Sequence, residues 1–216
     1  MIKQALKYTP EELEQIKNKK NSRDFNSDSW SDDDLSNIKT RIKEHYLDEQ
    51  KTTCPYCKRN LKTRHGRNWD IEHIIPRATV ANFMFEPLNL CMSCIDCNGA
   101  KSNKKVTKSR AQVKYPTKPN DFLIIHPHID DYEEHILVIK AGFYYISVGP
   151  KGPKTMDTCN LNRFYEFAGY GEDVDNDNEI AWLSNQLLNI TDTKIRQKTL
   201  LKIAELSLKA AVTNAN

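Results

Sequence analysis

The sequence predicts a small α+β protein with a helical N-terminal arm, a middle of turns and short strands, and a C-terminal region of strands followed by helices. Two helix-capping patterns lie near the N-terminus, turn-forming residues concentrate in the middle, and apolar stretches precede a long helical pattern at the end. The 216 residues are enough for one domain with appendages, and 38% hydrophobic content argues against wholesale disorder. We expect three parts, residues 1–50, 51–118 and 119–216.

The N-terminal arm predicts two helices. Residues 9–20 have Thr9 as N-cap and Pro10 at the first helical position, and Glu12 completes a capping box. A polar connector follows, after which Ser31 is the expected cap of the second helix. Apolar side chains then recur along one face of that helix, at Leu35, Ile38, Ile42 and Tyr46.

The remaining elements follow from composition and periodicity. Residues 51–100 are dense in Cys, Asn, Pro and Gly, which predicts turns and short strands. Residues 120–148 predict strands joined by a turn near Gly142. Two amphipathic helices are expected at 178–189 and 191–212.

Charge is distributed unevenly along the chain. Residues 51–118 contain 14 Lys and Arg residues against 4 Asp and Glu residues, whereas both flanks are net acidic. A basic centre favours binding to a polyanion, and a solvated lysine-rich surface is the alternative. We expect the acidic, helical flanks to serve protein contacts instead of nucleic acid.

No apolar run approaches the roughly 18 residues that a membrane span needs, and the first residues lack an apolar signal core. We therefore expect a cytoplasmic protein without membrane contact. In that compartment cysteines are more often metal ligands or free thiols than disulfides. Of the six cysteines, Cys159 stands alone and is expected in the core.

Two Cys-x-x-Cys pairs, Cys54 with Cys57 and Cys94 with Cys97, predict one structural zinc site. Four thiolates suit the tetrahedral geometry that zinc favours, and such a site contributes directly to folding. Cys91 and Cys94 form a further Cys-x-x-Cys, which leaves the second pair open. We prefer Cys97 because it fits the motif described next, and buried free cysteines are the alternative.

The stretch NWDIEHIIPRA places Asp70, Glu72 and His73 among isoleucines. A buried strand tolerates so many ionisable groups only if each is paired, so the stretch is either a polar edge or an active-site strand. In the later stretch CNGAK, Asn98 and Lys101 stand three residues apart, which places both on one helix face, in its first turn. The zinc site would hold the ends of this insert together and let His73 and Asn98 converge.

Several of these residues together resemble the HNH endonuclease family, the ββα-metal nucleases, over residues 54–101. The resemblance implies a zinc-knuckle ββα-metal core and a metal-dependent endonuclease that hydrolyses phosphodiester bonds. The family often has Asp where this chain has Glu72, so Asp70 remains a candidate helper. The matching elements, in chain order, are Glu72-His73, Asn89-Leu90, Cys94-x-x-Cys97-Asn98 and Lys101.

The resemblance also implies a role for each residue. His73 corresponds to a general base that deprotonates the attacking water. Glu72 and Asn98 correspond to oxygen ligands of one catalytic divalent cation, Mg²⁺ or Mn²⁺. Asn89 corresponds to a residue that holds the histidine loop in shape, and Lys101 to one that neutralises phosphate charge.

Residues 101–118 contain seven Lys and Arg residues and no acidic residue. Beside a nuclease site this strip predicts phosphate contacts, whereas alone it would be interpreted as a solvated linker. The resemblance implies DNA as the substrate, and Trp69 adds stacking character near the catalytic loop. The residues expected to contact nucleic acid are Arg64, Arg67, Arg77, Lys104, Lys105, Lys108 and Arg110.

A longer resemblance, over about residues 1–165, is to the HNH subunits of Septu-type and retron-associated anti-phage systems. It rests on CPYC, WDIEHIIPR, FEPLNL, IIHPHIDDYEEHI and CNLNRF. It implies the nuclease subunit of a defence complex, paired with an ATPase subunit and aimed at invading DNA. The terminal helix could pack on the protein itself, dock a partner or form a homodimer seam through Ile195, Ile203, Leu206 and Ala210.

Two acidic clusters carry weaker signals. Residues 126–135, HPHIDDYEEH, could hold a second metal, but Pro127 and the flanking strands favour a turn with polar caps. Residues 172–179, EDVDNDNE, space aspartates like a calcium loop but lack its glycine and final glutamate, which favours a helix-capping loop. For the whole chain, the alternative to an enzyme is a catalytically inactive zinc-ribbon subunit that binds nucleic acid or acts as a scaffold.

Overall fold

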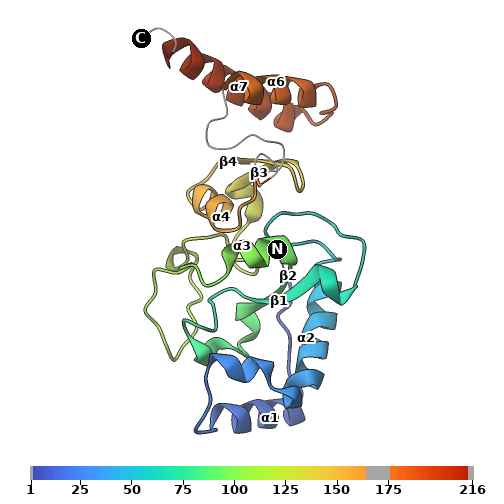
Figure 1. The fold of residues 1–216 in the computed structure, drawn as a ribbon, viewed down its shortest axis with the longest axis vertical. Coiled ribbons are helices and arrows are strands. Elements are labelled where there is room, and N and C mark those ends of the chain that lie inside the picture. Colours follow the sequence, from blue (N-terminus) through green and yellow to red (C-terminus); the bar gives the residue numbers. More distant parts are fainter. Residues whose placement is uncertain (1, 164–175, 214–216) are drawn as a thin grey trace. The chain divides into compact units, whose positions relative to one another are not determined.

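The structure is a computed structural model, which describes the backbone of residues 2–163 and 176–213 and the side chains of 2–163 and 179–207. The chain forms two compact units, residues 1–161 and 162–216, and each is described by itself below (Figure 1). The boundaries expected after residues 50 and 118 do not coincide with this division. Helices and short antiparallel strands occur together, which confirms the α+β class.

The first helix, α1 (Pro10–Lys20), is as predicted. The Thr9 hydroxyl accepts a hydrogen bond from the Glu12 N–H at 3.3 Å, and the Glu12 carboxylate accepts one from the Thr9 N–H at 2.8 Å. This reciprocal capping box satisfies two of the N–H groups that a helix start leaves open.

The second helix, α2 (Ser36–Glu49), begins four residues later than predicted, with Leu35 at its N-cap, so the expected Ser31 cap is wrong. Ser31 instead ends a short 3₁₀ helix, Ser27–Ser31, because Asn26 opens that turn with its own capping box. The predicted apolar face of α2 is correct, and all four of its side chains are fully buried: Leu35, Ile38, Ile42 and Tyr46.

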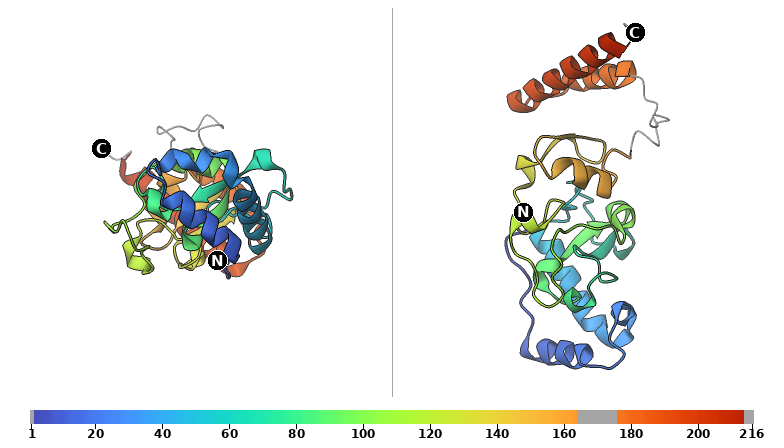
Figure 2. Two further views of the ribbon diagram at one scale, coloured as in Figure 1. Left: turned by 90° about the horizontal axis from the view of Figure 1, so that it is seen from below. Right: turned by 90° about the vertical axis from the view of Figure 1, so that its left-hand side faces the viewer.

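A strand pair and one short helix form the centre of the first unit. Strands β1 (Trp69–His73) and β2 (Leu90–Cys94) are antiparallel, with Trp69 opposite Cys94 and His73 opposite Leu90. Helix α3 (Ile95–Lys101) follows β2 directly and packs on both strands, while α2 packs against them as well (Figures 1 and 2). Because α3 has only seven residues, Lys101 is its last residue and not part of its first turn as expected.

The region after the basic strip contains one hairpin, β3 (Ile136–Lys140) and β4 (Tyr144–Ser147), followed by α4 (Gly152–Thr158). The predicted turn is confirmed: Gly142 has φ +86°, a conformation that glycine adopts without strain. Residues 120–135, expected to include a strand, form 3₁₀ turns at Pro119–Asp121 and Tyr132–Glu134 instead.

The N-terminal segment is part of the core and not a free arm. Ile2 and Leu6 are buried, the Ile2 N–H donates to the Pro127 carbonyl at 3.0 Å, and the Leu6 N–H donates to the Tyr46 hydroxyl at 3.2 Å. The Tyr46 hydroxyl in turn donates to the Pro87 carbonyl at 2.6 Å, so the net acidic N-terminal part of the chain packs directly against the basic centre.

The second unit contains α6 (Asn176–Leu187) and α7 (Thr193–Thr213), which pack on each other (Figure 2). Leu183 and Leu206 are buried, so part of the predicted apolar face packs within the unit. The Ala210 side chain, and Asp173 and Asp175 of the acidic loop, lie outside the described residues. None of the described helices is long and apolar enough to cross a bilayer.

Candidate active site

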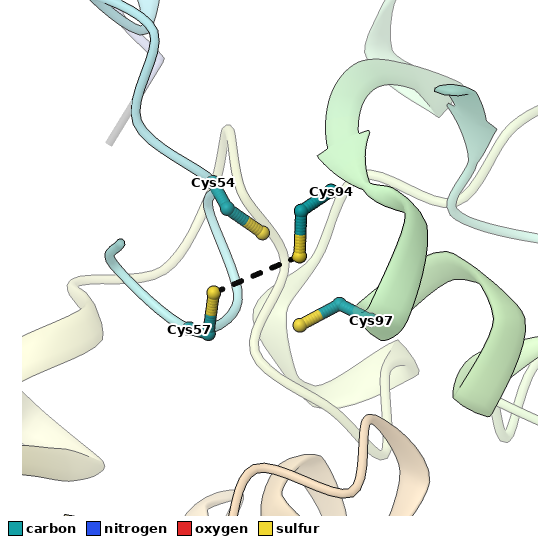
Figure 3. A group of neighbouring side chains, drawn as sticks. All are labelled: Cys54, Cys57, Cys94 and Cys97. Atoms are coloured by element: carbon teal, nitrogen blue, oxygen red, sulfur yellow. Dashed lines mark hydrogen bonds between the residues drawn. The ribbon is translucent and has the colours of Figure 1, made fainter. Parts of the chain in front are cut away.

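Two backbone turns bring the four predicted zinc ligands together. Cys54 and Cys57 lie on a tight turn in which the Lys58 N–H donates to the Cys54 carbonyl at 2.9 Å, and Lys58 takes the left-handed conformation with φ +55°. Cys94 ends β2 and Cys97 lies in the first turn of α3, facing the knuckle (Figure 3).

The four thiols form a compact, buried cluster. Their sulfur atoms all lie within 4.8 Å of one another, and those of Cys57 and Cys94 are 3.8 Å apart. A tetrahedral zinc with Zn–S bonds of about 2.3 Å places sulfur atoms about 3.8 Å apart. The cluster could therefore hold a metal ion, and it includes Cys97, the preferred ligand, and not Cys91.

Cys91 and Cys159 lie outside the cluster and behave as core residues. Both are fully buried, and burial raises the pKa of each thiol well above its usual value. Each side chain therefore stays a neutral thiol, which packs like a small apolar group.

His73 ends β1 as a buried, neutral imidazole. It is 7% exposed, and burial lowers its pKa to about 3, with the Arg77 charge adding to the shift. Its Nε2 lies 3.1 Å from the Met84 carbonyl oxygen. A carbonyl only accepts hydrogen bonds, so Nε2 carries the proton and Nδ1 carries the basic lone pair.

Asn89 fastens the loop that supplies this carbonyl. Its side-chain nitrogen donates to the carbonyls of Ile75 at 3.1 Å and Phe83 at 3.0 Å, and its side-chain oxygen accepts from the Ile75 N–H at 2.7 Å. Asn89 is fully buried and makes no approach to solvent. Phe83 directly precedes Met84, whose carbonyl contacts His73. The position of Asn89 therefore agrees with its expected role of holding the histidine loop in shape.

The carboxylates of β1 meet the polar face of α3 in two pairs. Asn98 donates to the Asp70 carboxylate at 2.8 Å, and Lys101 lies 2.6 Å from the Glu72 carboxylate. Lys101 also donates to the His73 carbonyl at 3.0 Å, while Tyr56 donates to Glu72 at 3.1 Å. Burial raises the pKa of Glu72, and the charge of Lys101 opposes that shift.

The position of Lys101 differs from the expectation that it meets a phosphate. It is 1% exposed, because the short α3 directs it under β1 to the buried Glu72. Its ammonium therefore compensates a protein carboxylate and fixes the backbone of the histidine.

A cavity of about 400 Å³ brings three of the predicted site residues to one place, but not Asn89 or Lys101. Glu72 and His73 line it from β1 and Asn98 lines it from α3. The two arms of this site come from segments 25 residues apart, joined by the hairpin whose ends the cysteine cluster holds. The order of elements, β1 then β2 then α3, is the ββα arrangement that the resemblance implies.

Comparison with known protein families supports this reading of the site. Residues 54–104 match the family model of the HNH endonucleases. We call residues 54–104 the HNH segment; it contains both cysteine pairs, β1, β2 and α3.

Similarity extends beyond the HNH segment. The chain is 29% identical over 127 residues to the Septu protein PtuB of Bacillus thuringiensis, which covers 58% of this chain. The match spans 42% of that relative, less than half of its length. No solved structure matches the chain.

The site also contains residues outside the HNH segment that sequence reasoning missed. Trp30 packs edge-on against the His73 ring, with 4.6 Å between ring centroids, and lines the cavity together with Asp28. Both come from the stretch interpreted as a polar connector. A lone tryptophan in such a stretch was the available signal, because so large an apolar ring needs a packing partner.

The residues expected to contact nucleic acid fall into three groups. Arg77 lines the cavity, and its guanidinium donates to the Ser27 carbonyl at 3.3 Å. Arg64 and Arg67 are exposed, with Arg64 paired to Asp48 at 2.5 Å. The four from the strip, Lys104, Lys105, Lys108 and Arg110, are exposed.

Proposed function

We propose that this protein is a metal-dependent HNH endonuclease that hydrolyses phosphodiester bonds of DNA. The single observation that carries the proposal is the cavity shared by Glu72, His73 and Asn98. The match of residues 54–104 to the HNH endonucleases supports nuclease activity, and the Septu protein among the relatives supports a role in anti-phage defence.

His73 is the proposed general base. A neutral imidazole can accept a proton, and with Nε2 held by Met84 the free lone pair is on Nδ1. Asn89 acts as a positioning residue, because it holds the loop whose carbonyl selects this tautomer. Trp30 holds the other side of the ring.

Glu72 and Asn98 are the proposed ligands of the catalytic cation, with Asp70 as a third oxygen donor. Carboxylate and amide oxygens are the donors that Mg²⁺ and Mn²⁺ prefer, so the residues present fit such an ion. When bound, the cation would stabilise negative charge on the phosphate and on the leaving oxygen. The charge of Lys101 opposes the rise in the pKa of Glu72 that burial causes, which makes Lys101 a positioning residue.

Zinc is the proposed occupant of the cysteine cluster. Four buried sulfur ligands select zinc over the hard cations, and a closed site of this kind is structural. It would hold the knuckle against the start of α3 and so fix the distance between β1 and Asn98.

We further propose that the nuclease works within a defence complex that contains an ATPase subunit. The relative named as a Septu protein and the longer sequence resemblance support this assembly. Exposed Leu188, Leu200 and Leu201 give the second unit apolar surface for such a subunit, or for a second copy of this chain. Loss of co-purification on deleting residues 191–216 would place the contact on α7.

The test of the nuclease itself is cleavage of supercoiled plasmid DNA by the purified protein, with its partner present, in Mg²⁺ or Mn²⁺. We expect wild type to cleave and His73→Ala to lose about 100-fold or more in rate, because general-base catalysis contributes that much. Equal rates would refute the assignment of His73. Binding without any cleavage by wild type would favour the inactive zinc-ribbon subunit.

A further inference from the structure

A second cavity adjoins the catalytic one and extends it toward α2. Its volume is about 460 Å³, within the range that holds a nucleotide-sized ligand. The two cavities share four lining residues, so they lie next to each other. The shared residues are Trp30, Ile71, Arg77 and Asn98.

Two lysines of α2 form the far wall of the second cavity. Lys39 and Lys43 are four residues apart, so they lie on one face of the helix, with Thr40 beside them. The Lys39 ammonium donates to the carbonyls of Trp30 at 3.0 Å and Asp32 at 3.2 Å. The Lys43 ammonium lies beside Gly66, where an added Cβ would come within 3.1 Å of it.

The second cavity carries an excess of positive charge. Lys39, Lys43 and Arg77 line it against one carboxylate, that of Asp70. In the part of the chain that the structure describes, none of the three cations forms an ion pair with a carboxylate. Uncompensated cations in a cleft attract anions, and backbone phosphates are the anions that a nuclease brings.

Trp30 stands between the two cavities. Its ring is partly exposed, contacts the His73 ring and lies 5.9 Å from the Lys39 ammonium. Aromatic faces stack on nucleic-acid bases without regard to sequence, so the ring can receive a base next to the cations.

We propose that the second cavity binds the nucleotide that flanks the scissile phosphodiester, with its phosphate on Lys39 and Lys43 and its base against Trp30. The proposal rests on the proposed function, because it takes the adjoining cavity to hold the scissile phosphate. It assigns α2, in the net acidic N-terminal part of the chain, to substrate binding. The path of the strand then runs across α2, in addition to any contact with the exposed strip 101–118.

The test measures binding and cleavage separately with the full-length chain. Binding of a short fluorescent DNA duplex is followed by anisotropy over a salt series, in a His73→Ala background that prevents cleavage. The variants are Lys43→Gln, Lys39→Gln and the pair together. Lys3→Gln is the matched control, since Lys3 is exposed and lines neither cavity.

Each single α2 variant is expected to weaken binding about tenfold at 50 mM salt and to reduce the salt slope by about 0.9, the effect of one lost phosphate contact, and the pair should reduce the slope by about 1.8. With His73 present, Lys43→Gln should raise KM and leave kcat unchanged. Lys3→Gln should match wild type in every measurement. Lys43→Gln carries the decision if Lys39→Gln disturbs folding, because the Lys39 ammonium also holds two backbone carbonyls.

Wild-type affinity and salt slope in the folded double variant would overturn the subsite. If wild type cleaves and Lys43→Gln binds and cleaves equally well, the subsite fails while the nuclease proposal stands. If no protein cleaves but the α2 variants lose binding as expected, the nuclease proposal fails while the α2 site stands.

Discussion

Two clusters of histidine and carboxylate in this protein share a sequence pattern but differ in access. Residues 70–73 and 126–130 each combine histidine and aspartate with isoleucine, and burial lowers the pKa of both His73 and His126. Each cluster also has a buried lysine–carboxylate pair. Those pairs are Glu72 with Lys101 at 2.6 Å and Asp130 with Lys151 at 2.5 Å.

In the second cluster the polar groups of His126 bond to other protein groups in the interior. His126 is 0% exposed, its Nε2 lies 2.9 Å from the Tyr115 hydroxyl, and its Nδ1 accepts from the His128 N–H at 3.2 Å. The Asp130 carboxylate accepts from the His126 N–H and caps the turn, which confirms the predicted turn with polar caps. The cluster links the 126–130 turn to the segment before α4 through the ion pair of Asp130 with Lys151.

The first cluster opens into a cleft instead. His73, Glu72 and Asn98 line the proposed catalytic cavity, and Asp70 lines the one beside it. Burial and the direction of the pKa shift are the same for the two histidines, so neither property distinguishes a catalytic residue from a structural one. A catalytic residue is distinguished from a structural one by its access to a cavity with convergent polar groups.

The largest expected effect is loss of the metal from the cysteine cluster, which holds the ends of the hairpin that carries Glu72 and His73. Cys94→Ser should release zinc and unfold the HNH segment, because structural zinc binding contributes on the order of 10 kcal/mol to folding. Cys91→Ser should keep the metal. Elemental analysis and circular dichroism of the two variants provide the measurement, and full zinc in Cys94→Ser with none in Cys91→Ser would contradict the ligand set.

The second largest effect is expected on removing the lysine of either buried ion pair. Lys101→Met and Lys151→Met each leave a buried carboxylate unpaired, so each should lower the free energy of unfolding by about 3–5 kcal/mol. Only Lys101→Met should also slow cleavage by the folded fraction, because only Glu72 lines the active cavity. Urea unfolding and cleavage rates measure the two effects; equal loss of activity would remove the distinction.

Asn89 gives a third contrast, within the histidine loop. Asn89→Ala removes three buried hydrogen bonds and should cost about 1–3 kcal/mol of stability along with most activity. The control is Asn82→Ala in the same loop, where an exposed side chain donates one bond to the Gln112 carbonyl. Similar activity in the folded variants would mean that the loop needs no such clamp.

The smallest effect is the acid sensitivity of the second cluster. The folded pKa of His126 lies well below its unfolded value near 6.5, so the unfolded chain binds the proton first as pH falls. Stability should be full above pH 6.5 and should decline below it by about 1.4 kcal/mol per pH unit from this group. His126→Gln should flatten the decline measured by urea unfolding between pH 7 and 5. An unchanged pH dependence would show that other groups cause it.

The ββα segment and its cysteine cluster could be predicted because their functional residues occur at characteristic short spacings along the sequence. Two Cys-x-x-Cys pairs admit few other uses in a chain of this kind, and the positions of His73 and Asn98 follow once the pairs meet. The caps of α1 could be predicted for the same reason, since a capping box is a contact over three residues.

The other half of the cleft could not be predicted, because it depends on tertiary packing. Lys39 and Lys43 sit on a helix whose segment is net acidic, and only the packing of α2 on the strand pair brings them beside Asn98. Trp30 reaches His73 through a 3₁₀ turn whose start at Asn26 competes with the expected helix cap. Average charge over 50 residues hides one basic helix face.

The most direct test of the account is the single-turnover cleavage rate of His73→Gln beside that of His126→Gln, in Mg²⁺ and with both proteins shown to be folded. Both substitutions replace a buried histidine whose pKa burial lowers, and of the two residues only His73 lines the cleft. We predict a loss of about 100-fold or more for His73→Gln and the wild-type rate for His126→Gln. Equal losses, or a larger loss for His126→Gln, would contradict the assignment of the active site.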